Sequence, residues 1–131
     1  YVNLADLYRN QQRDAEAERV LRQGLDRAAD RASIEFALGL TLVRLGTRDE
    51  ALTYLRRAHA SRPDVTRFGY VYAVAQFDMG KQSGSLRTLE HMHRRQPANR
   101  QVLELLVAYN QRLGREKAAQ RYAEALRKLG G

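Results

Sequence analysis

The three histidines are the residues of this sequence best suited to bind a metal ion or transfer a proton. Two of them, His91 and His93, stand close together in the string "EHMHRR". Residues two apart on a helix point in different directions, so these two cannot readily share a metal ion. His59 belongs to no ligand motif, and the sequence has no cysteine. We therefore expect no metal site and interpret the histidines as solvated or half-buried side chains.

The string "GKQSGS" at positions 80–85 has the composition of a phosphate-binding loop. It lacks the spacing of a Walker motif and follows no strand pattern, so we predict a turn between helices. The acidic pair Asp49 and Glu50 fits the start of a helix better than a matched acid and base. No nucleophile elbow and no HExxH motif are present. We predict that the protein is not an enzyme and needs no cofactor.

Positive charge is the other chemical feature of the 131-residue sequence, which has a formal net charge of +8 and a pI of about 10.3. The cations are scattered, with no run longer than a pair, and nearly all are arginines. We do not expect a nucleic-acid partner, although an arginine-rich face that binds a polyanion remains an alternative. The arginines of that face, which we place on the convex side, are Arg22, Arg56, Arg57, Arg87, Arg94 and Arg95.

The elements that carry these residues repeat with a period of 34. Pro63 and Pro97 are 34 residues apart, and Gly46, Gly80 and Gly114 follow at the same step. A repeat of this length is typical of stacked helical hairpins.

Each repeat has the pattern of two helices joined by a turn. Leu38, Leu42 and Leu45 recur at the spacing of one helix face. Gly46 then ends the first helix, and Pro63 ends the second. We expect the leucines to supply burial on that face.

Small residues stand where the two helices of a hairpin meet. Gly39 and Ala51 allow the helices to approach closely, and Ala58 leaves room for the first helix of the next repeat. These small residues, together with Leu38, Gly46, Leu55 and Pro63, resemble the signature of the tetratricopeptide repeat (TPR) family. The resemblance covers the whole chain, and Gln12 replaces the turn glycine in the first unit.

The resemblance implies an all-α fold, a right-handed superhelical solenoid of four helix–turn–helix units. We expect a single TPR domain over residues 1–131, with repeats at 1–31, 32–65, 66–99 and 100–131. Such a domain is expected to be a non-enzymatic module for protein–protein interaction, and to be a scaffold part of a larger protein. No apolar run is long enough to span a membrane.

The concave side, lined by the first helix of each unit, is where TPR proteins usually bind their partners. An apolar row runs along the first helices of the two central units, and the outer units are polar in the matching places. We predict a groove for an apolar helix or an extended peptide, anchored by Phe36, Tyr70 and Phe77. The predicted groove residues are Phe36, Leu40, Val43, Arg44, Tyr70, Val74, Phe77, Asp78, Asp6, Arg9, Glu104, Gln111 and Arg112. Arg67 alone matches the basic positions with which some TPR proteins clamp a peptide C-terminus.

Self-assembly through the ends of the array is a further alternative. We expect Ala119, Tyr122, Ala123 and Leu126 of the last helix to be partly uncovered, which would favour a homodimer. The stretch "VNLADLYRNQQRDAEAERVL" resembles TPR segments of bacterial multihaem cytochrome-type proteins. We therefore expect a bacterial protein, and leave open whether it is cytoplasmic or periplasmic.

Overall fold

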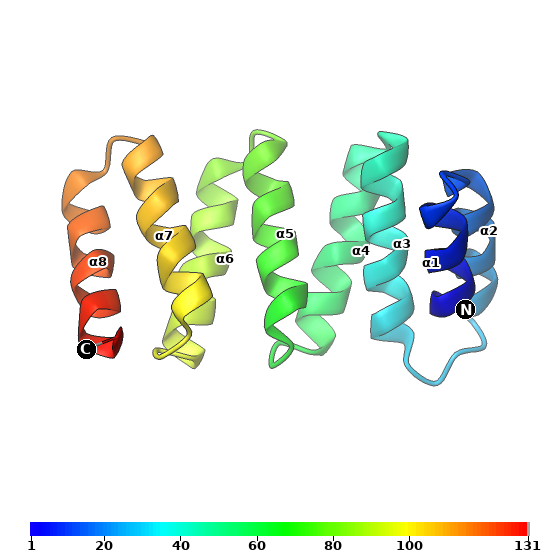
Figure 1. The fold of residues 1–131 in the computed structure, drawn as a ribbon, viewed down its shortest axis with the longest axis horizontal. Helices are drawn as coiled ribbons and strands as arrows, with labels where there is room; N and C mark the ends of the chain where they lie inside the picture. The colour runs from blue at the N-terminus through cyan, green and yellow to red at the C-terminus, as the bar shows by residue number, and fades with distance from the viewer. Residues whose placement is uncertain (131) are drawn as a thin grey trace. The chain divides into compact units, whose positions relative to one another are not determined.

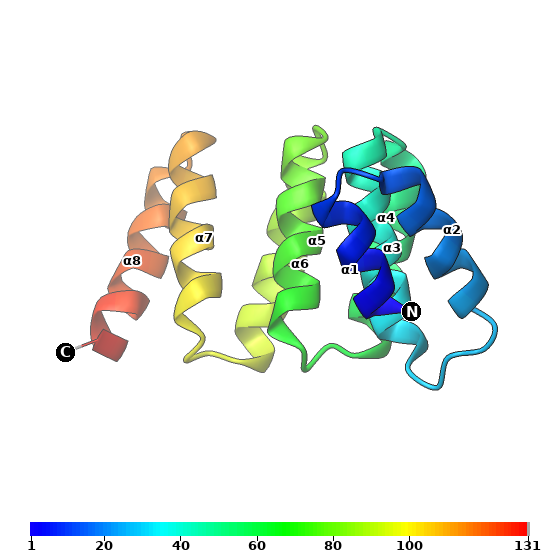
Figure 2. The same cartoon turned by 45° about the vertical axis from the view of Figure 1, so that its right-hand side comes forward.

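The computed structural model describes residues 1–130 and shows eight α-helices and no strand in that range. They form four hairpins, α1–α2, α3–α4, α5–α6 and α7–α8 (Figures 1 and 2). The helices are α1 (Val2–Asn10), α2 (Asp14–Gly24), α3 (Arg31–Leu45), α4 (Arg48–Ser61), α5 (Thr66–Asp78), α6 (Gln82–Arg95), α7 (Arg100–Arg112) and α8 (Glu116–Gly130). The predicted all-α class is confirmed. The assignment of the chain to a single domain with the four repeat bounds stays a prediction.

The turns inside the hairpins use a left-handed residue. Gly46, Gly80 and Gly114 have φ angles of 82°, 84° and 72°. In the first hairpin the same position is Gln12, with φ of 60°, which is the only positive value at a non-glycine residue within 1–130. The period of the glycines therefore marks the backbone position that each turn requires.

Two first helices begin at a side-chain cap. Asp30 accepts hydrogen bonds from the Ser33 backbone N–H at 3.2 Å and from Ser33 Oγ at 2.5 Å, and Asn99 accepts one from the Val102 N–H. These bonds from Ser33, with Arg62 at 3.3 Å, lower the pKa of the Asp30 carboxyl below its ordinary value of 3.8. Both caps fix where the chain turns into a helix.

The contacts group the chain into two compact units, the first being Tyr1–Tyr72 and the second beginning at Ala73. The division falls inside α5, whose first residues belong to one unit and whose last residues belong to the other. The core of the first unit is a cluster from α1 to α4, made of Ala5, Ala17, Leu21, Ile34, Ala37, Leu38, Leu42 and Ala51.

Close helix packing in the first unit depends on Gly39, as predicted. A Cβ atom at this position would lie 2.7 Å from Leu55 Cγ and Cδ2, so the absence of a side chain lets α3 and α4 meet. The predicted burial of the leucine face needs one correction. Leu38 and Leu42 are buried, but Leu45 is 40% exposed because it is the last residue of α3.

The core of the second unit lies among α5, α6, α7 and α8. It consists of Ala73, Phe77, Leu86, Leu89, Met92, Val102, Leu103, Leu106, Tyr109 and Tyr122. Ser85 stands where the other repeats have alanine, and its buried hydroxyl donates to the Ala73 carbonyl at 2.7 Å. A small polar residue is thus accommodated inside this core by a hydrogen bond.

The prediction for the last helix is only partly right. Ala119 and Tyr122 are buried within the second unit, since Tyr122 belongs to its core, while Ala123 is exposed and Leu126 is half-buried. On α1, the large apolar side chains with exposed fractions of 45–51% are Tyr1, Leu4 and Leu7. Self-assembly remains a prediction. No helix within residues 1–130 is long and apolar enough to cross a membrane.

Candidate functional site

A pocket of about 180 Å³ opens among the first helices of the first unit. Helices α1, α3 and α5 supply its walls, which are apolar at the floor and charged at the rim. The lining residues are Val2, Asp6, Arg9, Ser33, Phe36, Ala37, Leu40, Arg67 and Phe68. Four of the predicted groove residues, Asp6, Arg9, Phe36 and Leu40, therefore share one hollow.

The floor of the pocket is an aromatic pair. The rings of Phe36 and Phe68 stack with their centroids 4.6 Å apart, and both residues are buried. The Arg67 guanidinium carbon lies 5.0 Å from the centre of the Phe36 ring, at cation–π distance. Phe36 is only 5% exposed, so it serves the packing of the unit whether or not it also touches a ligand. Its role as an anchor stays a prediction.

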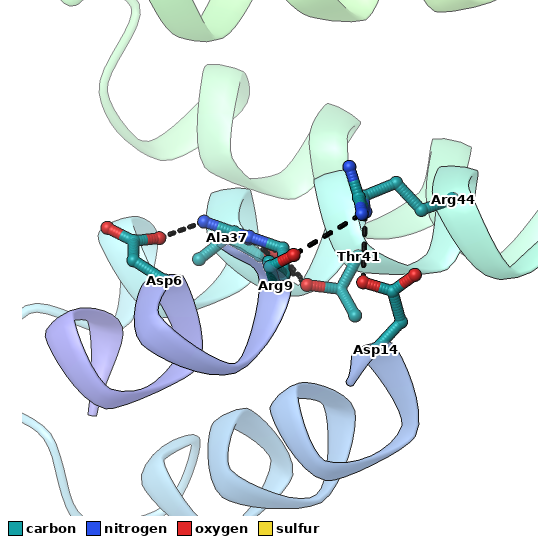
Figure 3. A network of polar contacts seen from close by, with 6 residues as sticks. All are labelled: Asp6, Arg9, Asp14, Ala37, Thr41 and Arg44. Carbon is teal, nitrogen blue, oxygen red and sulfur yellow. Dashed lines mark hydrogen bonds and ion pairs between the residues drawn. The ribbon is translucent and has the colours of Figure 1, made fainter. Parts of the chain in front are cut away.

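The rim on α1 is held by a polar network that joins α1 to α3 (Figure 3). Arg9 Nη1 donates to the Ala37 carbonyl at 3.0 Å and to Thr41 Oγ1 at 3.1 Å, while Nη2 pairs with Asp6. The Thr41 hydroxyl donates to the same carbonyl at 2.9 Å. Because its side chain is only 15% exposed, Arg9 acts first as a clamp between two helices.

Arg44 belongs to the same network but does not line the pocket. Its Nε atom donates to Asp14 Oδ1 at 2.9 Å, and Nη2 donates to the Arg9 carbonyl at 3.4 Å. The remaining predicted residues of this unit, Val43 and Tyr70, also lie outside the lining; Val43 is 40% exposed and Tyr70 is half-buried.

In the second unit the predicted residues divide between core and surface. Phe77 is buried and stacks on Tyr109 with ring centroids 3.8 Å apart, and Arg112 lies 5.0 Å from the centre of the Phe77 ring. Val74 is half-buried, whereas Asp78, Glu104 and Gln111 are exposed. This aromatic pair with an arginine on it resembles the arrangement of Phe36, Phe68 and Arg67 in the first unit.

Sequence reasoning missed five residues that line the pocket. Phe68 occupies the repeat position of Ile34 and Val102, both buried, so its place in the period predicts core rather than a pocket wall. Arg67 carried a signal, because it stands at a basic position used by other repeats of this type. Val2, Ser33 and Ala37 gave none.

The arginines of the predicted convex face are partly engaged in ion pairs. Arg22 donates to Glu18 at 2.8 Å and to Glu50 at 2.9 Å, so α2 is tied to α4. Although burial opposes the charged form, the hydrogen bonds to both glutamates raise the pKa of the Arg22 guanidinium. Within residues 1–130 no group of three or more histidine, aspartate or glutamate side chains is placed to hold a metal ion.

Comparison with known proteins agrees with the geometry. Residues 1–31 match the family model described as "Tetratricopeptide repeat". A crystal structure of MamA has a TM-score of 0.79 at 15% identity, over 99% of this chain and 76% of that one. MamA from Desulfovibrio magneticus RS-1 gives 0.76 at 17% identity, over 98% and 72% of the chains. No curated protein sequence matches the chain.

A tetratricopeptide repeat protein from Parabacteroides merdae has a TM-score of 0.87 at 14% identity, over 98% of this chain and 52% of that chain. At these identities the structural likeness speaks for the fold. The family match covers the first repeat, and the 34-residue period carries the same hairpin along the chain. The chain is therefore a tetratricopeptide repeat protein, built on a scaffold of the kind used for protein–protein interaction.

Proposed function

We propose that the protein binds a peptide segment of a partner through the first-unit pocket, and that this pocket is one part of the predicted concave groove. The observation that carries the proposal is the shape and lining of the hollow. An apolar floor with a few polar groups at the rim is typical of a site that takes one side chain and orients its backbone.

The charges at the rim favour an acidic segment. Asp6 pairs with Arg9, so these two charges offset each other. Arg67 is exposed and forms no ion pair in the part of the chain that the structure describes, and it lies on the face of Phe36. We infer that an apolar side chain of the partner occupies the floor while an adjacent carboxylate pairs with Arg67.

The test is a selection of peptides from a random library on the immobilised chain, followed by affinity measurement for the enriched sequences. Leu40→Glu places a charge on the half-buried wall and is expected to weaken binding at least tenfold. Arg67→Gln is expected to weaken acidic peptides about tenfold, the effect of losing roughly 1.4 kcal/mol.

Two variants outside the pocket serve as controls. Val20→Glu makes the same change on α2 at a half-buried site, and Arg48→Gln removes an exposed arginine from α4. Equal binding by the Leu40→Glu variant and the unmodified chain would show that the first-unit pocket is not the binding site. Enriched peptides without acidic residues would refute the role of Arg67 alone.

A further inference from the structure

A second hollow, of about 460 Å³, lies in the second unit where α5 turns into α6. Its lining is Gln76, Gly80, Lys81, Gln82, Ser83, Gly84 and Arg87, which includes most of the string "GKQSGS". The string forms the turn that the sequence predicted. No carboxylate is among these residues, and the two charged side chains, Lys81 and Arg87, are cations.

The first turn of α6 presents unsatisfied donors to this hollow. Lys81 precedes the helix and provides no side-chain cap, and the first turn contains no acidic residue. The backbone N–H of Ser85 is taken by the Lys81 carbonyl, whereas the N–H groups of Gln82, Ser83 and Gly84 have no acceptor among the described residues. A helix start of this kind attracts an anion, but it does not by itself make a site.

The independent observation is the side chain of Gln76, which is 7% exposed and forms part of the wall. Thr88 Oγ1 donates to its Oε1 at 2.8 Å, while its Nε2 amide has no acceptor in the described part of the chain. A methyl group added at Gly84 would lie 2.9 Å from this Nε2 atom and 3.8 Å from Arg87 Nη2. A buried amide donor and a guanidinium thus converge over the first turn of the helix.

The next repeat provides an internal comparison, because the same turn there lacks these features. Asn110 stands 34 residues after Gln76, and its Nδ2 is already bonded to the Leu106 carbonyl at 2.7 Å. Glu116 stands 34 residues after Gln82 and puts a negative charge in the first turn of α8. The equivalents of Lys81 and Arg87 are Arg115 and Arg121. Two cations are therefore present at both turns, but only α6 combines them with a vacant amide donor and no carboxylate.

The charge of the second unit acts in the same direction. From residue 73 onward the sequence has eleven lysines and arginines against five carboxylates, a net charge of +6. Among the described residues of this unit the ion pair is Arg127 with Glu124, and neither Lys81 nor Arg87 takes part in one. Both cations remain available to a ligand.

We propose that the hollow formed by Gln76, Lys81, Gln82, Ser83, Gly84 and Arg87 binds a phosphate group, free or esterified on a small soluble molecule. The N–H groups of the α6 start and the Gln76 amide donate to its oxygens, and Lys81 and Arg87 offset its charge. This site is additional to the peptide pocket and does not depend on it.

The experiment is a titration of the ¹⁵N-labelled chain with inorganic phosphate, followed by two-dimensional NMR, beside a sodium chloride titration at equal ionic strength. We expect saturable shifts of the backbone signals of Gln82, Ser83 and Gly84 and of the Gln76 side-chain amide, with phosphate alone. Lys81→Gln is expected to weaken binding about tenfold. Arg115→Gln, which removes the equivalent cation of the next repeat, is expected to leave it unchanged.

A second variant separates binding from folding. Gln82→Glu introduces the acid that the next repeat has at this position, so it stabilises α6 through the macrodipole while repelling phosphate. We expect a higher melting temperature together with loss of the phosphate shifts. Unchanged shifts in this variant, equal effects of Lys81→Gln and Arg115→Gln, or the same shifts with chloride would overturn the proposal. Binding to phosphatidic acid vesicles without binding of inorganic phosphate would overturn it as well.

Discussion

Gln12 holds a left-handed backbone conformation at a position where the other three hairpins have glycine. An L-residue in this conformation places its Cβ too close to the following carbonyl oxygen, which costs about 1–2 kcal/mol. The turn still forms, because Arg13 N–H donates to the Tyr8 carbonyl at 2.7 Å, as Thr47 N–H does to Leu42 in the next hairpin. The strain is thus retained in a turn whose hydrogen bonds match those of the glycine turns.

We predict that Gln12→Gly stabilises the chain by about 1 kcal/mol, because glycine adopts positive φ without strain. The reverse exchange, Gly46→Ala, should destabilise it by a similar amount, since nothing lies within 4 Å to make steric contact with the new methyl group and only the backbone term changes. Urea denaturation of both variants gives the two values. A loss of stability in Gln12→Gly would mean that the Gln12 side chain makes a contribution larger than the strain.

At the scale of helices, Arg9 is the side chain that holds α1 on α3 (Figure 3). We predict that Arg9→Met lowers the free energy of unfolding by about 1.5–3 kcal/mol, the usual worth of hydrogen bonds from a charged group. Arg9→Lys should recover little of this loss, because an ammonium cannot reach two acceptors and Asp6 with the geometry of a guanidinium. Chemical denaturation followed by circular dichroism measures both.

Arg13→Met is the matched control for this prediction. Arg13 is exposed, lies 4.7 Å from the centre of the Tyr8 ring and precedes α2 without binding α3. Its replacement should change stability by less than about 1 kcal/mol. If Arg9→Met is as mild as this control, the clamp contributes nothing beyond an ordinary surface arginine.

The elements were predictable from the sequence, but the roles of many side chains were not. The glycines at 46, 80 and 114 end each first helix, and the need for Gly39 followed from its place between two helices. Periodicity fails where two repeats use one position differently. Gln76 and Asn110 are equivalent and both buried, yet only Asn110 bonds its amide to its own helix. Phe68 follows the period of the core and still forms a pocket wall.

For the molecule as a whole, the hydrophobic side chains form one cluster in residues 1–72 and another from residue 73 onward. Repeat proteins of this kind are stabilised by contacts between neighbouring elements, so a local defect need not unfold the whole chain at once. Leu21 in the first cluster and Leu103 in the second are both fully buried, which makes them a matched pair for testing this.

We predict that Leu21→Ala and Leu103→Ala each cost about 2–5 kcal/mol, but in different parts of the chain. Native-state hydrogen exchange should accelerate most among the amides of α1 to α4 in Leu21→Ala, and among those of α6 to α8 in Leu103→Ala. This follows because each leucine touches only the cluster of its own unit. Equal acceleration along the whole chain in both variants would show instead that the four hairpins unfold as one cooperative domain, and that the continuous helix α5 transmits the loss of either core to the other.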